Sequence, residues 1–196
     1  MTARSAYQSL SMGLCPWLRA PLQQLEQARR HGRLAHGWLL TGPEGLGKIN
    51  LALVAAGRML NAQASPVDTL PPQQGAEAMA QRHEPADHHP DLHWLFPEDD
   101  RRTLSVEQIR RTAAALALTS LEGPAKVVVV EPADAMTVAA ANALLKTLEE
   151  PTPGTYLLLI AHQPGRLAAT IRSRCRHLPV PKPATGAVLE WLSRFD

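Results

Sequence analysis

A glycine-rich loop that ends in a lysine is the part of this sequence best suited to chemistry. Gly42, Gly45, Gly47 and Lys48 belong to a segment with the pattern G-x-x-x-x-G-K. Glycines allow backbone N–H groups to surround phosphate oxygens, and the lysine ammonium reaches the outer phosphates. The sequence therefore predicts a phosphate-binding loop that joins a strand to a helix.

The residue after this lysine departs from the pattern. A Ser or Thr hydroxyl normally follows the lysine and binds Mg²⁺, whereas this chain has Ile49. Without that hydroxyl the metal loses one of its few protein ligands. We therefore expect the loop to be kept as architecture, with ATP binding that is weak or absent.

The composition is that of one globular domain of ordinary size. The chain has 196 residues, of which 45% are hydrophobic and 4% aromatic, and a formal net charge of +2. This charge permits contact with nucleic acid but does not argue for it. Cys15 and Cys175 are too few for a disulfide framework. With neither an apolar run of about 18 residues nor a signal peptide, a soluble cytoplasmic protein without membrane contact is expected.

Helical and strand-like segments alternate along the chain, which predicts an α/β fold with a parallel sheet flanked by helices. An amphipathic helix carries Leu18, Leu22, Leu25 and Ala28, and the segment from Ser105 fits a capping box with Gln108 at its third position. The expected strands are Gly37–Thr41, Lys126–Val130, Thr155–Ile160 and His177–Val180. The other expected helices are Asn50–Leu60, Thr137–Glu150, Leu167–Ser173 and Ala184–Phe195.

Residues 61–100 interrupt this alternation with six prolines and read as an irregular insertion, with a short helix possible around Gly75–Gln81. Histidines 83, 88, 89 and 93 lie in it, at irregular spacing and without a cysteine. These histidines could bind zinc or could be ordinary loop residues that face solvent, and we prefer the second interpretation. No metal site is predicted.

Two further segments carry a family resemblance. Asn142–Pro151 reads N-A-L-L-K-T-L-E-E-P after one predicted strand, and Ser173-Arg174-Cys175 follows the next. Together with the glycine loop, Pro16-Trp17-Leu18 and His89-Pro90-Asp91, they resemble the AAA+ clamp-loader proteins from about Cys15 to Val180.

The resemblance implies an AAA+, P-loop NTPase-like domain over 1–182 and the start of a small helical domain, here cut short, over 183–196. It also implies a hetero-oligomer with motor and other clamp-loader subunits that places a sliding clamp on primed DNA in replication. In that setting Arg174 is implied to be an arginine finger acting in trans, as the one catalytic residue. Many relatives carry four cysteines where this chain has none, so no zinc is expected.

The departures from the family pattern concern hydrolysis. ATPases of this kind end a strand in Asp-Glu, whereas here Glu131 and Pro132 follow Val130, and proline cannot act as a base. The polar residue that senses the γ-phosphate falls at Ala161 or His162. A subunit without ATPase or polymerase chemistry of its own is therefore expected. An active motor-type ATPase and a module that binds ATP without turnover are the alternatives.

Overall fold

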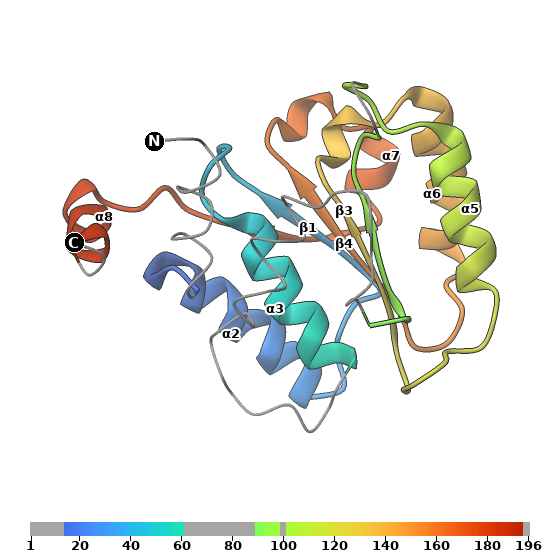
Figure 1. Ribbon diagram of the computed structural model, residues 1–196, viewed down its shortest axis with the longest axis horizontal. Helices are drawn as coiled ribbons and strands as arrows, with labels where there is room; N and C mark the ends of the chain where they lie inside the picture. The colour runs from blue at the N-terminus through green and yellow to red at the C-terminus, as the bar shows by residue number, and fades with distance from the viewer. Residues whose placement is uncertain (1–13, 61–88, 99–100, 194–196) are drawn as a thin grey trace.

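A five-stranded parallel sheet, in the order β2-β3-β4-β1-β5, is the centre of the structure (Figure 1). The computed structural model describes residues 14–60, 89–98 and 101–193. The strands are β1 Gly37–Thr41, β2 Leu92–Leu95, β3 Lys126–Val130, β4 Thr155–Ala161 and β5 Arg176–Pro179. All four pairings are parallel, which confirms the predicted fold class.

Helices cover both faces of this sheet (Figure 1). The helical elements are η1 Pro16–Leu18, α2 Arg19–Arg30, α3 Lys48–Leu60, α5 Val106–Leu116, η2 Ala133–Ala135, α6 Val138–Glu149, η3 Pro164–Arg166, α7 Ala169–Arg172 and α8 Thr185–Leu192. Helices α2 and α3 lie on one face, and α5, α6 and α7 lie on the other. The predicted helices that fall on the described residues are thus confirmed, with differences at their ends.

Strand residues divide the core into two halves because successive side chains point to opposite faces of a sheet. Trp38 and Leu40 of β1 pack with α2 and α3, whereas Leu39 packs with the helices of the other face. Every residue of β3 is buried, and β3 lies between β2 and β4. The continuous valine run is therefore an interior strand, as predicted from its composition.

Helix starts are fixed by the side chains that the sequence indicated. The Ser105 hydroxyl accepts a hydrogen bond from the Gln108 N–H (3.3 Å), and the Ser105 N–H donates to the Gln108 side chain (3.0 Å). Thr137 accepts from the Ala140 N–H (3.1 Å) at the start of α6. These caps satisfy backbone donors that have no partner inside a helix.

The prediction that the whole of 61–100 is irregular is wrong for Leu92–Leu95, which forms the edge strand β2 beside β3. Local composition hid this strand, because its stability comes from pairing with β3 rather than from its own pattern. Just before it, the Asp91 carboxylate accepts from the N–H groups of Leu121 and Glu122, both at 2.9 Å. This buried carboxylate joins the start of β2 to the loop before β3.

His89 and His93 are half-buried rather than solvent-facing, which corrects the reading of them as free loop residues. The His89 ring lies 3.7 Å from the Glu122 carboxylate. Burial lowers the pKa of His93 below its ordinary value, although the Asp91 charge acts in the opposite direction. The expected helix around 75–81, His83 and His88 lie outside the described residues.

Helix α8 lies apart from the sheet (Figure 1) and is joined to the rest by an aromatic contact. The rings of Trp17 and Trp191 meet edge to face with centroids 5.5 Å apart. That 183–196 begins a second domain stays a prediction.

Candidate functional site

The glycine loop joins β1 to α3, which is the context that its pattern predicts. Gly42, Gly45 and Gly47 have φ angles of 151°, 82° and 78°, which L side chains rarely adopt. A β-carbon at Gly42 would lie 2.5 Å from the carbonyl oxygen of Val180, so glycine is required there. The Trp17 indole N–H donates to the Leu46 carbonyl (3.0 Å) and holds the loop against η1.

The ammonium of Lys48 is bonded to the loop itself. Its side chain is buried, and Nζ donates to the carbonyl oxygens of Gly42 (2.8 Å) and Pro43 (2.6 Å). Burial lowers the pKa of Lys48, while the charges of Glu131, and then those of Asp134 and Glu44, act in the opposite direction. To reach a phosphate, this lysine has to give up its two hydrogen bonds to the loop carbonyls.

The residues of the loop do not fit Mg²⁺-ATP. Ile49 is at the position of the usual metal-binding hydroxyl. Its side chain is 6% exposed and packs in the core on the α2–α3 side of the sheet. A side chain that faces this core neither ligates a cation nor points into the cleft. Ile49 therefore supplies no ligand for Mg²⁺.

The carboxyl ends of β3 and β4 are joined by a residue that the sequence analysis missed. Asp134, in the turn after β3, accepts hydrogen bonds from the N–H groups of His162 and Gln163, both at 3.0 Å. The sequence feature that could have indicated Asp134 is a carboxylate that follows a buried strand by a few residues. The carboxyl ends of parallel neighbouring strands meet at one edge of the sheet, so such a carboxylate can contact the residues after the next strand. Pro132, at the position of the usual base, offers no carboxylate.

His162 occupies the expected sensor position as a half-buried ring. Its Nδ1 is buried and has no hydrogen-bond partner among the described residues. Burial lowers the pKa of His162, and the positive charge of Lys48 lowers it further. The charges of Asp134 and Glu44 act in the opposite direction on this pKa.

An open cleft of about 570 Å³ lies beside the loop, at the carboxyl ends of the strands. This is where open α/β sheets bind ligands. Its lining comes from the loop, from the segment after β4 and from the end of β5: Thr41, Gly42, Pro43, Glu44, His162, Gln163, Pro164, Pro179 and Val180.

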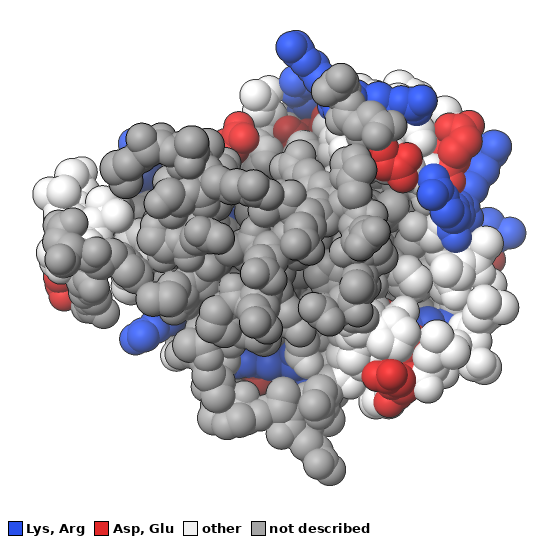
Figure 2. Space-filling model, viewed as in Figure 1, with Lys and Arg blue, Asp and Glu red and all other residues white. Residues whose placement is uncertain are grey.

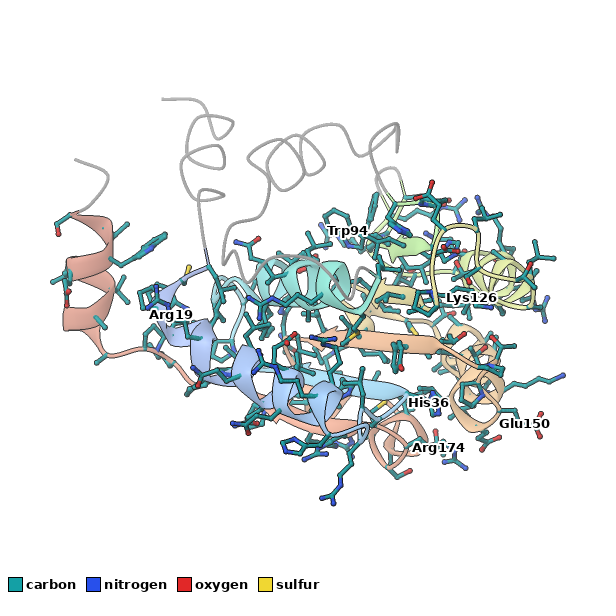
Figure 3. All side chains as sticks on the ribbon, turned by 90° about the horizontal axis from the view of Figure 1, so that it is seen from below. Arg19, His36, Trp94, Lys126, Glu150 and Arg174 are labelled. Atoms are coloured by element: carbon teal, nitrogen blue, oxygen red, sulfur yellow. The ribbon has the colours of Figure 1, made fainter. Side chains whose placement is uncertain are left out.

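Arg174 lies at the other end of the strands. It precedes β5, and its backbone carbonyl lies 3.5 Å from the β-carbon position of Gly37, the first residue of β1. Figure 3 shows Arg174 on the same side as His36, which precedes β1, and Glu150, which follows α6. Because β1 rises roughly 3.3 Å per residue, its length separates Arg174 from the chain's own glycine loop.

The Arg174 guanidinium lies at the surface, where both of its terminal nitrogens have a partner in this chain. Nη2 is 2.5 Å from Oε1 of Glu149, with side chains 38% and 47% exposed, and Nη1 donates to the Thr170 carbonyl (3.0 Å). Arg172 likewise donates to a backbone carbonyl, that of Pro164 (3.1 Å), and Arg176 lies over the Trp38 ring (5.0 Å). Among the described residues, Arg174 differs from these two neighbours by its ion pair with the Glu149 carboxylate.

The described part of the chain contains no cluster of potential metal ligands. Among residues 14–60, 89–98 and 101–193, no three His, Cys, Asp or Glu side chains are grouped to hold a metal ion. Over α5, on the right of Figure 2, basic and acidic side chains are interspersed, and Arg111 pairs with Glu98 at 3.4 Å. None of the described helices is long and apolar enough to cross a membrane.

Comparison with solved structures supports the fold. A gamma-subunit-related protein of DNA polymerase III from Thermotoga maritima has a TM-score of 0.55 at 24% identity, covering 82% of this chain and 46% of that one. The RuvB Holliday junction branch migration motor of the same organism has a TM-score of 0.55 at 19% identity, covering 90% and 48%. At these identities the likeness concerns the fold alone.

Comparison of sequences gives the family. The model described as DNA polymerase III, delta subunit, matches residues 18–184. Proteins named DNA polymerase III subunit delta' are similar: that of Pseudomonas aeruginosa is 42% identical over 91% of this chain, and that of Escherichia coli is 39% identical over 91%. The chain spans about half the length of these relatives, 52% in both cases. The chain therefore belongs to the DNA polymerase III delta-subunit family, whose delta-prime members it is similar to, and this confirms the AAA+ clamp-loader resemblance.

Proposed function

We propose that this protein is a clamp-loader subunit that does not hydrolyse ATP and lends Arg174 to the ATP site of a neighbouring subunit. The observation that carries the proposal is the exposed guanidinium of Arg174, at the end of the strands opposite to the chain's own glycine loop. A cation in this place cannot serve its own loop, but it can face a neighbour.

The chain's own cleft lacks the groups for hydrolysis. Ile49 is in the core, Pro132 has no carboxylate, and Lys48 is bonded to loop carbonyls. Loss of a general base alone costs about 10²–10⁴-fold in rate, and loss of metal positioning adds to that. ATP binding in this cleft is accordingly weak or absent.

Arg174 suits a role in trans because its release from this chain costs little. Exposed ion pairs such as that with Glu149 are worth only about 0.2–1 kcal/mol. An arginine finger contributes on the order of 10³–10⁵ in rate, which corresponds to roughly 4–7 kcal/mol. The planar guanidinium matches the oxygens of a γ-phosphate. Arg174 therefore gains more by binding a neighbour's γ-phosphate than it loses by leaving the Glu149 carboxylate.

The proposed partners are those of a clamp-loader complex. We infer partners of the motor and delta kinds in a cytoplasmic hetero-oligomer, which reaches the sliding clamp and primed DNA through the assembly. The names of the similar proteins support this, since they are subunits of DNA polymerase III. The proposal includes no zinc and no polymerase chemistry in this chain.

The test is ATP turnover by a loader that contains the Arg174→Ala variant. Turnover should fall while the thermal unfolding of the variant is unchanged, although fingers from other subunits at other sites limit the size of the effect. Arg174→Lys should restore little, because a point charge cannot make the bidentate contact. Arg176→Ala is the matched control, because Arg176 packs on Trp38. Clamp loading at the parental rate by the Arg174→Ala loader would refute the assignment.

The isolated chain separates this proposal from its two rivals. It should show no ATPase above background and no ATP binding by calorimetry in the presence of Mg²⁺. Turnover that Lys48→Ala abolishes identifies a motor-type ATPase instead. Tight ATP binding without turnover identifies a nucleotide-sensing module.

A further inference from the structure

Asp134 joins the turn after β3 to the segment after β4. One carboxylate oxygen accepts from the His162 N–H and the other from the Gln163 N–H, each at 3.0 Å. These bonds span 28 and 29 residues of sequence and fix the first two residues after β4. Both bonds have an ordinary N–H···O length, and the charge of the acceptor makes them stronger than bonds to a neutral acceptor.

Two successive backbone N–H groups that converge on one acceptor form an anion-binding arrangement. In this chain the anion is a side chain of the protein itself. The position of the segment after β4 is therefore supported by a group within the chain.

A series of contacts leads from this segment to Arg174. The Arg166 N–H donates to the Gln163 carbonyl (2.9 Å), which closes η3. The Pro164 carbonyl accepts from the Arg172 guanidinium (3.1 Å), which joins η3 to the last residue of α7. The Arg174 N–H donates to the Ile171 carbonyl (3.1 Å), and Ile171 is fully buried.

We propose that Asp134 is a positioning residue that fixes the segment after β4 and, through Arg172 and α7, the placement of Arg174. This inference rests on the proposed function of Arg174. It adds that the finger is held in place by the chain's own carboxylate rather than by a nucleotide in the chain's own cleft.

The test is a double-mutant cycle in a loader that contains the protein. Asp134→Ala should lower the kcat for ATP toward the value of Arg174→Ala, and not below it, with KM unchanged. The double variant should then turn over ATP at the rate of Arg174→Ala alone, because one residue acts through the other. Asp134→Asn should fall in between, since its amide oxygen still accepts one of the two hydrogen bonds.

Amide hydrogen exchange on the chain alone gives a second readout. Asp134→Ala should speed exchange at His162, Gln163 and Arg172 and leave the amide of Val128, inside β3, unchanged. Unchanged exchange at Arg172 would overturn the inference.

The possible failures can be told apart. If Arg174→Ala has no effect, the proposed function fails. If Arg174→Ala slows turnover but Asp134→Ala does not, the inference fails and the proposed function stands. A double variant that is slower than Arg174→Ala by the full effect of Asp134→Ala shows independent roles, and this also overturns the inference.

Discussion

Replacing Ile49 by threonine restores the hydroxyl that the glycine-loop pattern lacks, and it tests where this side chain points. Ile49 is 6% exposed and packs in the core on the α2–α3 side of the sheet. If that placement is correct, the new hydroxyl faces the core and not the cleft. The variant should then lose stability without gaining a metal site.

The size of the loss follows from the groups that change. Ile49→Thr removes two buried carbon groups, worth about 0.8 kcal/mol each. It also buries a hydroxyl, which costs about 1–3 kcal/mol unless a helix carbonyl accepts its proton. A loss of about 2 kcal/mol is expected if a carbonyl accepts the proton and about 3–5 kcal/mol if none does, which lowers the Tm of a domain of this size by about 4–20 °C.

Urea and thermal unfolding measure the stability, and calorimetry with ATP and Mg²⁺ measures the binding. Ile49→Val is the matched control, and it should cost only about 0.5–1.5 kcal/mol because it keeps the site apolar. A threonine variant as stable as the parent, with Mg²⁺-dependent ATP binding, would refute the reasoning, because Ile49 would then face the cleft.

Three other predictions concern stability and reactivity. Gly42→Ala should lower the free energy of unfolding by more than about 1 kcal/mol, since its β-carbon meets a backbone carbonyl at 2.5 Å. Stability should fall as the pH drops below about 6.5, because burial lowers the pKa of His93 and His162, and the unfolded chain then binds protons that the folded chain does not. Cys15 and Cys175 should react slowly with a thiol reagent at pH 8, because burial raises the pKa of both to about 11.

Each of these predictions has its own control. Gly45→Ala should cost less than Gly42→Ala, since the space around Gly45 is open. Equal losses of stability for the two variants would contradict the clash at Gly42. Replacing both histidines by glutamine should flatten the pH dependence between about 5 and 6.5, and an unchanged slope would assign it to other groups. Both thiols should react rapidly in urea, and equal rates in folded and unfolded protein would show that they are exposed.

The sequence by itself determined the family and every strand except β2. The valine run of β3, the Ser105 capping box and the glycine loop are patterns within a few neighbouring residues, so their physics can be read along the chain. Three ordered motifs, from the loop to Ser173-Arg174-Cys175, indicate the AAA+ clamp-loader proteins from sequence alone.

Tertiary structure alone decided what surrounds the candidate residues. The edge strand Leu92–Leu95 exists because β3 offers it a partner, and its own proline-rich surroundings argue against it. The loop carbonyls that bind Lys48 and the carboxylate that pairs with Arg174 were not indicated by any local pattern.

The bonds of Asp134 give the physical reason for this division. They join residues 28 and 29 positions apart, and the two segments meet only because β3 and β4 are neighbours in the sheet with their carboxyl ends at one edge. The order of strands also places Arg174 and the glycine loop at opposite ends of β1. Strand order depends on the packing of the whole chain, so it emerges only when all of the strands are in place.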